Sequence, residues 1–62
     1  MSYRVSWPGT GQYNGPYSTL SAAVRERDSS NAYDTQHRQG GPKAVVVAYI
    51  GDGEWRVMRP QP

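Results

Sequence analysis

Residues 44–58 read AVVVAYIGDGEWRVM, and this stretch decides the fold. Its first half is rich in β-branched residues, which favours a strand. Asp52-Gly53 favours a type I′ turn. The twist of that turn matches the twist of the flanking strands, which suits a hairpin. Glu54 to Met58 can then return as a second strand. The C-terminal part of the chain is therefore predicted to be a β-hairpin.

A two-residue turn also predicts which side chains share each face of this hairpin. The face turned toward the core is expected to hold two cross-strand pairs: Ile50 with Trp55 and Ala48 with Val57. The opposite face is expected to hold two others: Tyr49 with Arg56 and Val47 with Met58. If the loop has an odd number of residues instead of two, a bulge shifts the phase and the two faces exchange roles.

A short helix is predicted upstream of the hairpin. Residues 8–16 hold three glycines and two prolines and are expected to form a loop. Ser18 or Thr19 suits the N-cap that follows, because a hydroxyl can accept a hydrogen bond from a free amide of the first turn. Three apolar side chains then share one face at helical spacing: Leu20, Ala23 and Val24. Ser29-Ser30-Asn31 is expected to end the helix.

The remaining segments complete a fold of order β-α-β-β. Tyr3 to Trp7 alternates apolar and polar residues, as a half-buried strand does. Residues 31–43 are predicted to form a polar loop, and residues 59–62 a flexible tail. The sequence thus predicts a single small α+β domain over residues 1–62, with a three-stranded sheet, a C-terminal hairpin and one short helix packed on one face. Both a mixed and a fully antiparallel sheet satisfy the pattern.

The expected core combines residues of the first strand, the helix and the hairpin: Tyr3 or Val5, Trp7, Leu20, Ala23, Val24, Val46, Ala48, Ile50, Trp55 and Val57. The chain has 62 residues, no cysteine and one histidine. Disulfides are therefore excluded, and a zinc site, which needs Cys and His ligands, is not expected. No cofactor is expected either.

Charge and hydropathy restrict the location of the protein. Seven Lys or Arg residues against five Asp or Glu residues give a net charge of +2, and the basic residues are scattered along the chain. The apolar run 44–50 is far shorter than the ~20 residues of a membrane span. The N-terminus lacks the layout of a signal peptide. A cytoplasmic protein without membrane contact is expected.

Three groups of residues carry side chains suited to catalysis, but none has the required pattern. The glycine-rich segment 9–15 has neither the dinucleotide-binding nor the P-loop spacing. His37 and Asp34 lie in the predicted loop, without a nucleophile or a rigid support. Asp52 and Glu54 belong to a convex hairpin tip, whereas glycoside hydrolysis requires a cleft between two carboxylates. The sequence does not favour an enzyme.

Aromatic and basic residues give the strongest indication of binding. One helix can cover one face of the sheet, so the other face should expose apolar and aromatic side chains, as interaction sites do. Tyr, Trp and Arg are also the residues most often found at binding hot spots. The predicted partner-binding residues lie on this face and in the basic loop: Tyr49, Arg56, Val47, Met58, Arg38 and Lys43.

The preferred function is a non-enzymatic protein that occupies a surface of a larger protein or nucleoprotein complex. A phage or mobile-element inhibitor of a bacterial defence complex, of the anti-CRISPR type, is the form expected of so small a domain. A homodimer through the open sheet face is a second use of the same surface. The alternative is a nucleic-acid-binding module, whose affinity would fall steeply with salt concentration.

Overall fold

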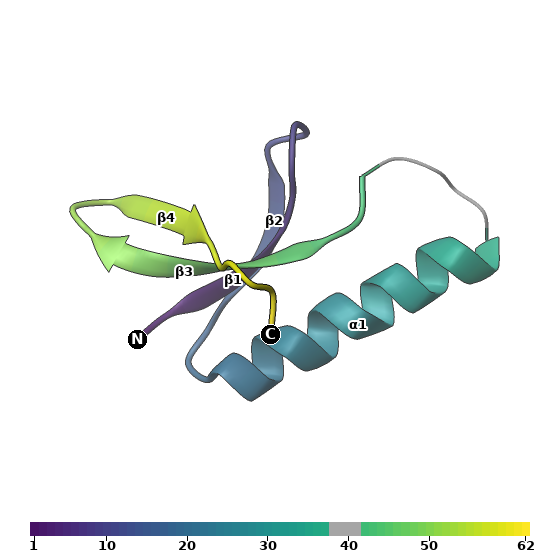
Figure 1. The fold of residues 1–62 in the computed structure, drawn as a ribbon, viewed down its shortest axis with the longest axis horizontal. Coiled ribbons are helices and arrows are strands. Elements are labelled where there is room, and N and C mark those ends of the chain that lie inside the picture. Colours follow the sequence, from purple (N-terminus) through teal and green to yellow (C-terminus); the bar gives the residue numbers. More distant parts are fainter. Residues whose placement is uncertain (38–41) are drawn as a thin grey trace.

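The computed structural model describes residues 1–37 and 42–62, and of His37 it describes the backbone only (Figure 1). The elements follow one another as β1 (Tyr3–Trp7), β2 (Gln12–Tyr17), α1 (Leu20–His37), β3 (Val45–Gly51) and β4 (Glu54–Val57). The strands form one sheet in the order β2-β1-β3-β4, and all neighbouring strands are antiparallel. The α+β class is confirmed, and the sheet has four strands where the sequence predicted three.

Strand β2 overlaps residues 8–16, which were predicted to be a loop, and extends one residue beyond them. It pairs with β1 through three consecutive positions, from Val5 opposite Asn14 to Trp7 opposite Gln12. The connecting turn is held by Thr10, whose hydroxyl donates to Trp7 O at 2.6 Å and accepts from Gln12 N at 3.1 Å. The glycines and proline of this segment are tolerated because β2 is an edge strand, which does not need a complete hydrogen-bond ladder.

Gly15 lies where the β1–β2 register shifts by a residue. Its φ is +119°, a region that L side chains rarely adopt. A Cβ at this position would lie 3.1 Å from Tyr3 O and 3.2 Å from a carbon of the Tyr17 ring. The bulge therefore requires glycine for its dihedral angle and also for the space around it.

Gly15→Ala is expected to lower the free energy of unfolding by about 1–3 kcal/mol, because strain at a positive φ adds to the close approach of Tyr3 O. Gly9→Ala is the matched control: Gly9 has φ +82°, but no atom lies within 4 Å of its Cβ position. Urea denaturation should show the larger loss for Gly15→Ala. Equal losses in the two variants would contradict the packed bulge.

Helix α1 begins as predicted and continues further than predicted. Thr19 is the N-cap, since its Oγ1 accepts a hydrogen bond from Ala22 N at 3.3 Å. The helix passes through Ser29-Ser30-Asn31 and ends at His37, so the first part of the predicted loop 31–43 is helical. Asn31 does not terminate the helix because its side chain binds the backbone of Ala44, at 2.8 Å from Ala44 N and 3.1 Å from Ala44 O.

The β3–β4 hairpin has the predicted two-residue turn but a different register. Asp52 and Gly53 both have positive φ, at 54° and 76°, as a type I′ turn requires. Gly51 lies opposite Glu54, and Tyr49 lies opposite Trp55, so Ile50 is an extra residue on β3. This bulge shifts the phase of β4 by one residue. The predicted pairs Tyr49–Arg56 and Val47–Met58 are therefore wrong, as are Ile50–Trp55 and Ala48–Val57.

The core lies between α1 and the face of the sheet formed by Val5 and Val46. Its fully buried part is Val5, Ala23, Ala44 and Val46, and six partly buried side chains pack around it: Tyr3, Trp7, Tyr17, Leu20, Val24 and Met58. Ile50, predicted to be buried, is 48% exposed because it occupies the bulge. The phase shift also moves Trp55 and Val57 to the opposite face. Three residues of this core were not predicted from the sequence: Ala44, Tyr17 and Met58.

The C-terminal segment is connected to both layers through the side chain of Gln61. Its amide accepts from Val46 N and donates to Val46 O, both at 2.9 Å, and it also donates to Met58 O at 2.8 Å. Arg27 of α1 donates to the same Gln61 oxygen at 3.1 Å. Gln61 thus gives Val46 N its acceptor and adds a second donor to Val46 O, which also accepts from Met58 N at 3.1 Å.

Candidate functional site

The strand pairing assigns each side chain to one face of the sheet. Ala48 lies opposite Tyr3 on one neighbouring strand and opposite Arg56 on the other. Because Tyr3 packs against the core, all three side chains are on the helix face. Arg4 lies opposite Val47, and Val47 lies opposite Val57, so these belong to the other face. Tyr13 lies opposite Ser6, which is two residues from Arg4, so Tyr13 is on this second face as well. Tyr49 lies opposite Trp55, and both are two residues from the pair Val47–Val57, so they are also on it. Because α1 packs against the first face, the second face is not covered by a helix in the described part of the chain (Figure 1).

Four side chains on this uncovered face form a continuous row, which we call the stacked row: Tyr13, Arg4, Trp55 and Tyr49. The Cζ of Arg4 lies 4.0 Å from the centroid of the Tyr13 ring and 3.9 Å from that of a Trp55 ring. Both distances are well inside the range of cation–π attraction. Since Tyr13 is on β2 and Trp55 is on β4, the Arg4 side chain bridges the two edge strands of the sheet.

Tyr49 extends the stacked row at the hairpin end. Its ring centroid lies 5.0 Å from that of Trp55, with the planes tilted by 58°. Its hydroxyl accepts a hydrogen bond from Gly53 N at 2.9 Å, which ties the ring to the turn. Tyr49 and Trp55 can meet because the Ile50 bulge places them directly opposite each other. The bulge that overturned the predicted register therefore builds this part of the site.

The Arg4 guanidinium interacts with an aromatic ring on each side, Tyr13 and Trp55. Within residues 1–37 and 42–62, the ion pair that forms is between Arg27 and Asp28, at 2.8 Å, on α1. The Nε of Arg4 is buried and has no hydrogen-bond partner among the described residues. A guanidinium fixed between two aromatic faces offers a positive charge and a rigid surface at the same place.

The structure brings together only part of the predicted binding residues. Tyr49 and Val47 lie on the uncovered face, but Val47, which lies opposite Arg4, is only 7% exposed. Arg56 and Met58 do not belong to this face: Arg56 is on the helix face beside Ala48, and Met58 packs against the core. Lys43 is exposed before β3, and Arg38 lies outside the described residues.

Arg4, Tyr13 and Trp55 belong to the site but were not among the predicted binding residues. Arg4 and Trp7 are three residues apart on β1 and therefore lie on opposite faces. The period-two alternation of β1 was the signal that could have placed Arg4 on the uncovered face. Tyr13 could not be placed without β2, and Trp55 could not be placed without the bulge.

In the described part of the structure, the candidate catalytic residues do not form a common site. Asp34 is on α1, whereas Asp52 and Glu54 belong to the β3–β4 turn and to β4. His37 is the last residue of α1, and its side chain lies outside the description. In the described ranges, no group of three or more His, Cys, Asp or Glu side chains is arranged to hold a metal ion. No helix there is long and apolar enough to cross a membrane.

Comparison with known proteins adds no further constraint on this site. No family model matches the chain, and no curated protein or solved structure matches it.

Proposed function

We propose that this protein is a non-enzymatic binding protein whose contact surface is the uncovered sheet face. The observation that carries the proposal is the stacked row, in which Arg4 is held between Tyr13 and Trp55. This row combines aromatic rings with a guanidinium, and these are the side chains most enriched at binding hot spots.

Exposure and rigidity support a contact role for this row. Tyr13 is 51% exposed and Tyr49 is 36% exposed, so each end of the row offers an aromatic surface to a partner. Arg4 and Trp55 are fixed by their neighbours before any partner arrives. A partner would therefore bind side chains that have already lost most of their rotamer freedom, which lowers the entropic cost of binding.

The partner that we propose is a larger protein or nucleoprotein complex. Within that class, we propose an inhibitor of a bacterial defence complex, of the anti-CRISPR type. A domain of this size can act by covering a functional surface without catalysis, and a nucleoprotein target offers both protein and nucleic-acid groups to an aromatic and cationic face. The test of this role is co-expression with a defence complex during phage infection, where plaque counts should rise.

A nucleic-acid-binding module is the second candidate, and the same row favours it. Aromatic rings on an open sheet stack bases, and a guanidinium neutralises phosphate. The two candidates differ in salt dependence: affinity for a single strand falls by about 0.7 powers of salt concentration for each phosphate contacted. Fluorescence anisotropy with a 12-nucleotide oligothymidine between low and moderate salt would detect this candidate.

A photocrosslinking experiment tests the contact surface directly. A photoreactive phenylalanine analogue at position 13 should capture a partner in producing cells, whereas the same analogue at Ser21, an exposed position on α1, should not. With the purified partner, Tyr13→Ala together with Tyr49→Ala is expected to weaken binding by about 2 kcal/mol or more, the usual threshold of a hot spot. Isothermal titration calorimetry measures the loss.

Arg56→Ala is the matched control for this surface, since Arg56 is exposed but lies on the helix face. It should bind the partner like the original protein. A folded Tyr13→Ala/Tyr49→Ala variant with unchanged affinity, or an Arg56→Ala variant with the same loss, would contradict the assignment of this face. Far-UV circular dichroism establishes that each variant is folded.

A further inference from the structure

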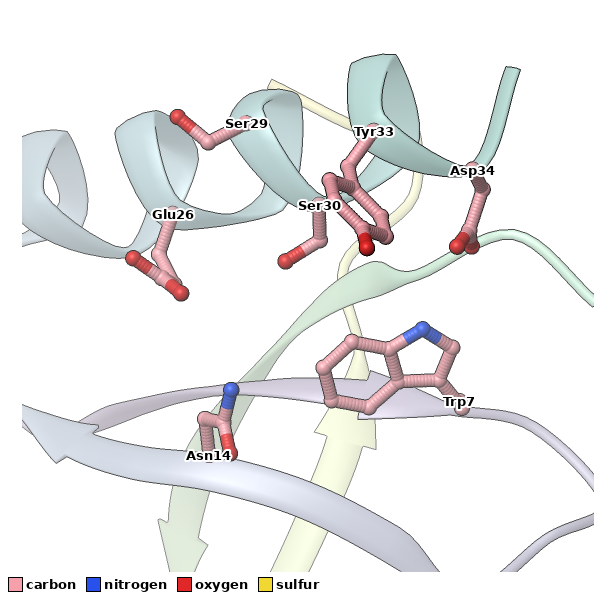
Figure 2. A pocket seen from close by; sticks show the side chains of 7 residues that line it. All are labelled: Trp7, Asn14, Glu26, Ser29, Ser30, Tyr33 and Asp34. Carbon is pink, nitrogen blue, oxygen red and sulfur yellow. The ribbon is translucent and has the colours of Figure 1, made fainter. Parts of the chain in front are cut away.

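A groove of about 350 Å³ lies on the other side of the sheet, between α1 and the β1–β2 hairpin (Figure 2). The residues that matter for its chemistry come from three elements: Trp7, Asn14, Glu26, Ser30, Tyr33 and Asp34. The helix residues among them lie at positions 26, 30, 33 and 34, so the helical repeat places them on one side of α1. Figure 2 shows their side chains directed from the helix toward the sheet, with Glu26 on the side of Asn14 and with Tyr33 and Asp34 on the side of Trp7.

The groove carries negative charge and no described positive charge. Glu26 and Asp34 are both half-buried, and they lie eight residues apart along the helix, at the two ends of the groove. None of the described residues that line it is a lysine or an arginine. Neither carboxylate takes part in the ion pair that the described residues form, which joins Arg27 and Asp28. The groove therefore has charge complementarity to a cation.

Tyr17 reports the influence of one of these carboxylates. Partial burial, together with the negative charge of Glu26, raises the pKa of Tyr17 above its ordinary value of 10.0. Tyr17 is neutral below this pKa, so the shift shows only that the negative charge of Glu26 is felt at a neighbouring side chain.

The floor of the groove is an aromatic ring fixed by the core. Trp7 packs against the buried cluster around Val5, so its indole does not need to be ordered when a ligand binds. Ser30 adds a hydroxyl acceptor to the groove, Asn14 lines it with its side-chain amide, and Tyr33 adds a second aromatic side chain. A ring face with carboxylates and neutral acceptors at its border suits a flat cation with several donors.

We propose that this groove binds the guanidinium group of an arginine side chain presented by a partner protein. A guanidinium is planar and stacks on an indole, and its five N–H donors suit the acceptors that line the groove. Glu26 and Asp34 lie about 12 Å apart along the helix, so one can bond the guanidinium while the other acts on it through its charge. An ammonium has three donors in a compact group and cannot stack in this way. The groove and the stacked row lie on opposite faces of the sheet, so this inference does not rest on the proposed function.

Titration with small arginine derivatives tests the proposal. The probes are a Gly-Gly-Arg-Gly-Gly peptide, its citrulline counterpart, which has nearly the same shape without the charge, its lysine counterpart, and the free guanidine compound agmatine. Nuclear magnetic resonance follows the two indole N–H signals of the ¹⁵N-labelled protein. The Trp7 signal should shift and saturate with the arginine peptide, and the Trp55 signal, on the other face, should stay in place.

Charge-removing variants assign the effect to the groove. Glu26→Gln with Asp34→Asn keeps the shape of both side chains and should weaken binding of the arginine peptide at least tenfold. Asp52→Asn, at the exposed hairpin tip, removes a charge outside the groove and should leave the binding unchanged. Binding should also weaken as salt rises, because the carboxylates are only half-buried.

Four results would overturn the proposal: no saturable shift at Trp7, equal binding of the citrulline peptide, tighter binding of the lysine peptide, or full binding by a folded Glu26→Gln/Asp34→Asn variant. Tighter binding of agmatine than of the arginine peptide would overturn the assignment to a partner protein, because a free guanidine compound would then be the better ligand.

Discussion

Asn31→Ala is expected to lower the free energy of unfolding by about 3 kcal/mol, because it removes both hydrogen bonds that join α1 to the start of β3. The two partners are the amide and the carbonyl of Ala44, which is 2% exposed. Without Asn31, a buried amide and a buried carbonyl would remain unsatisfied, and each such group costs about 1–3 kcal/mol. The effect should thus exceed that of an ordinary polar substitution on a helix surface.

Thr35→Ala is the control for this prediction. Thr35 is exposed one turn further along α1, and its hydroxyl donates to Asn31 O at 3.0 Å. Its loss should change stability by less than about 0.5 kcal/mol, as surface substitutions usually do. Urea denaturation followed by circular dichroism measures both variants. If the two variants unfold at the same urea concentration, Asn31 does not hold the helix to the sheet.

Gln61→Ala is expected to lower the free energy of unfolding by about 2–3 kcal/mol. The substitution leaves the amide of Val46, a residue with 0% exposure, without its acceptor at 2.9 Å. It also removes the bonds to Val46 O, Met58 O and Arg27. The unsatisfied buried amide should dominate the loss, because bonds of exposed groups are replaced by water.

Gln61→Glu separates the donor role of this side chain from its acceptor role. A carboxylate can still accept from Val46 N and Arg27, but it places a negative oxygen near two carbonyl oxygens that now receive a donor at 2.9 and 2.8 Å. We expect a loss comparable to that of Gln61→Ala. Gln36→Ala, at an exposed glutamine of α1, is the control and should have little effect. A stable Gln61→Glu variant would show that the donor bonds contribute little.

Both predictions concern contacts that compensate for a small core. A domain of 62 residues has a total stability of about 3–9 kcal/mol by the usual value per residue. The fully buried cluster contains two valines and two alanines, and larger side chains are only partly buried. Side-chain amides that satisfy buried backbone groups therefore contribute a substantial share of the stability, and either substitution could unfold a large fraction of the molecules.

Both candidate binding surfaces use the attraction between a guanidinium and aromatic rings, but one surface presents the guanidinium and the other receives it. On the uncovered face, the protein presents its own guanidinium between two rings. In the groove, an indole and two carboxylates are arranged to receive a guanidinium from elsewhere. Because the surfaces lie on opposite faces of the sheet, variants of one can be combined with intact residues of the other, and their effects should be additive.

The helix and the hairpin show which features local sequence determined. Thr19 caps α1 because its hydroxyl meets an amide three residues ahead, and this depends on neighbouring residues alone. Asp52-Gly53 forms the turn because both residues adopt positive φ, which is again a local property. The apolar spacing of Leu20, Ala23 and Val24 correctly gave the face that packs on the sheet. The α+β class followed from these local signals.

Tertiary structure alone decided the features that involve distant partners. Glycine and proline disfavour strands, yet 12–17 is a strand because β1 pairs with it and because an edge position tolerates Pro16. Asparagine is unfavourable inside a helix, yet α1 continues past Asn31 because the Asn31 side chain forms hydrogen bonds with the backbone of Ala44. The Ile50 bulge moved Trp55 onto the face of Arg4, and no local pattern sets a bulge beside an intact turn. The sequence by itself therefore determined the elements with local causes, whereas the binding face depended on pairing between segments far apart in the chain.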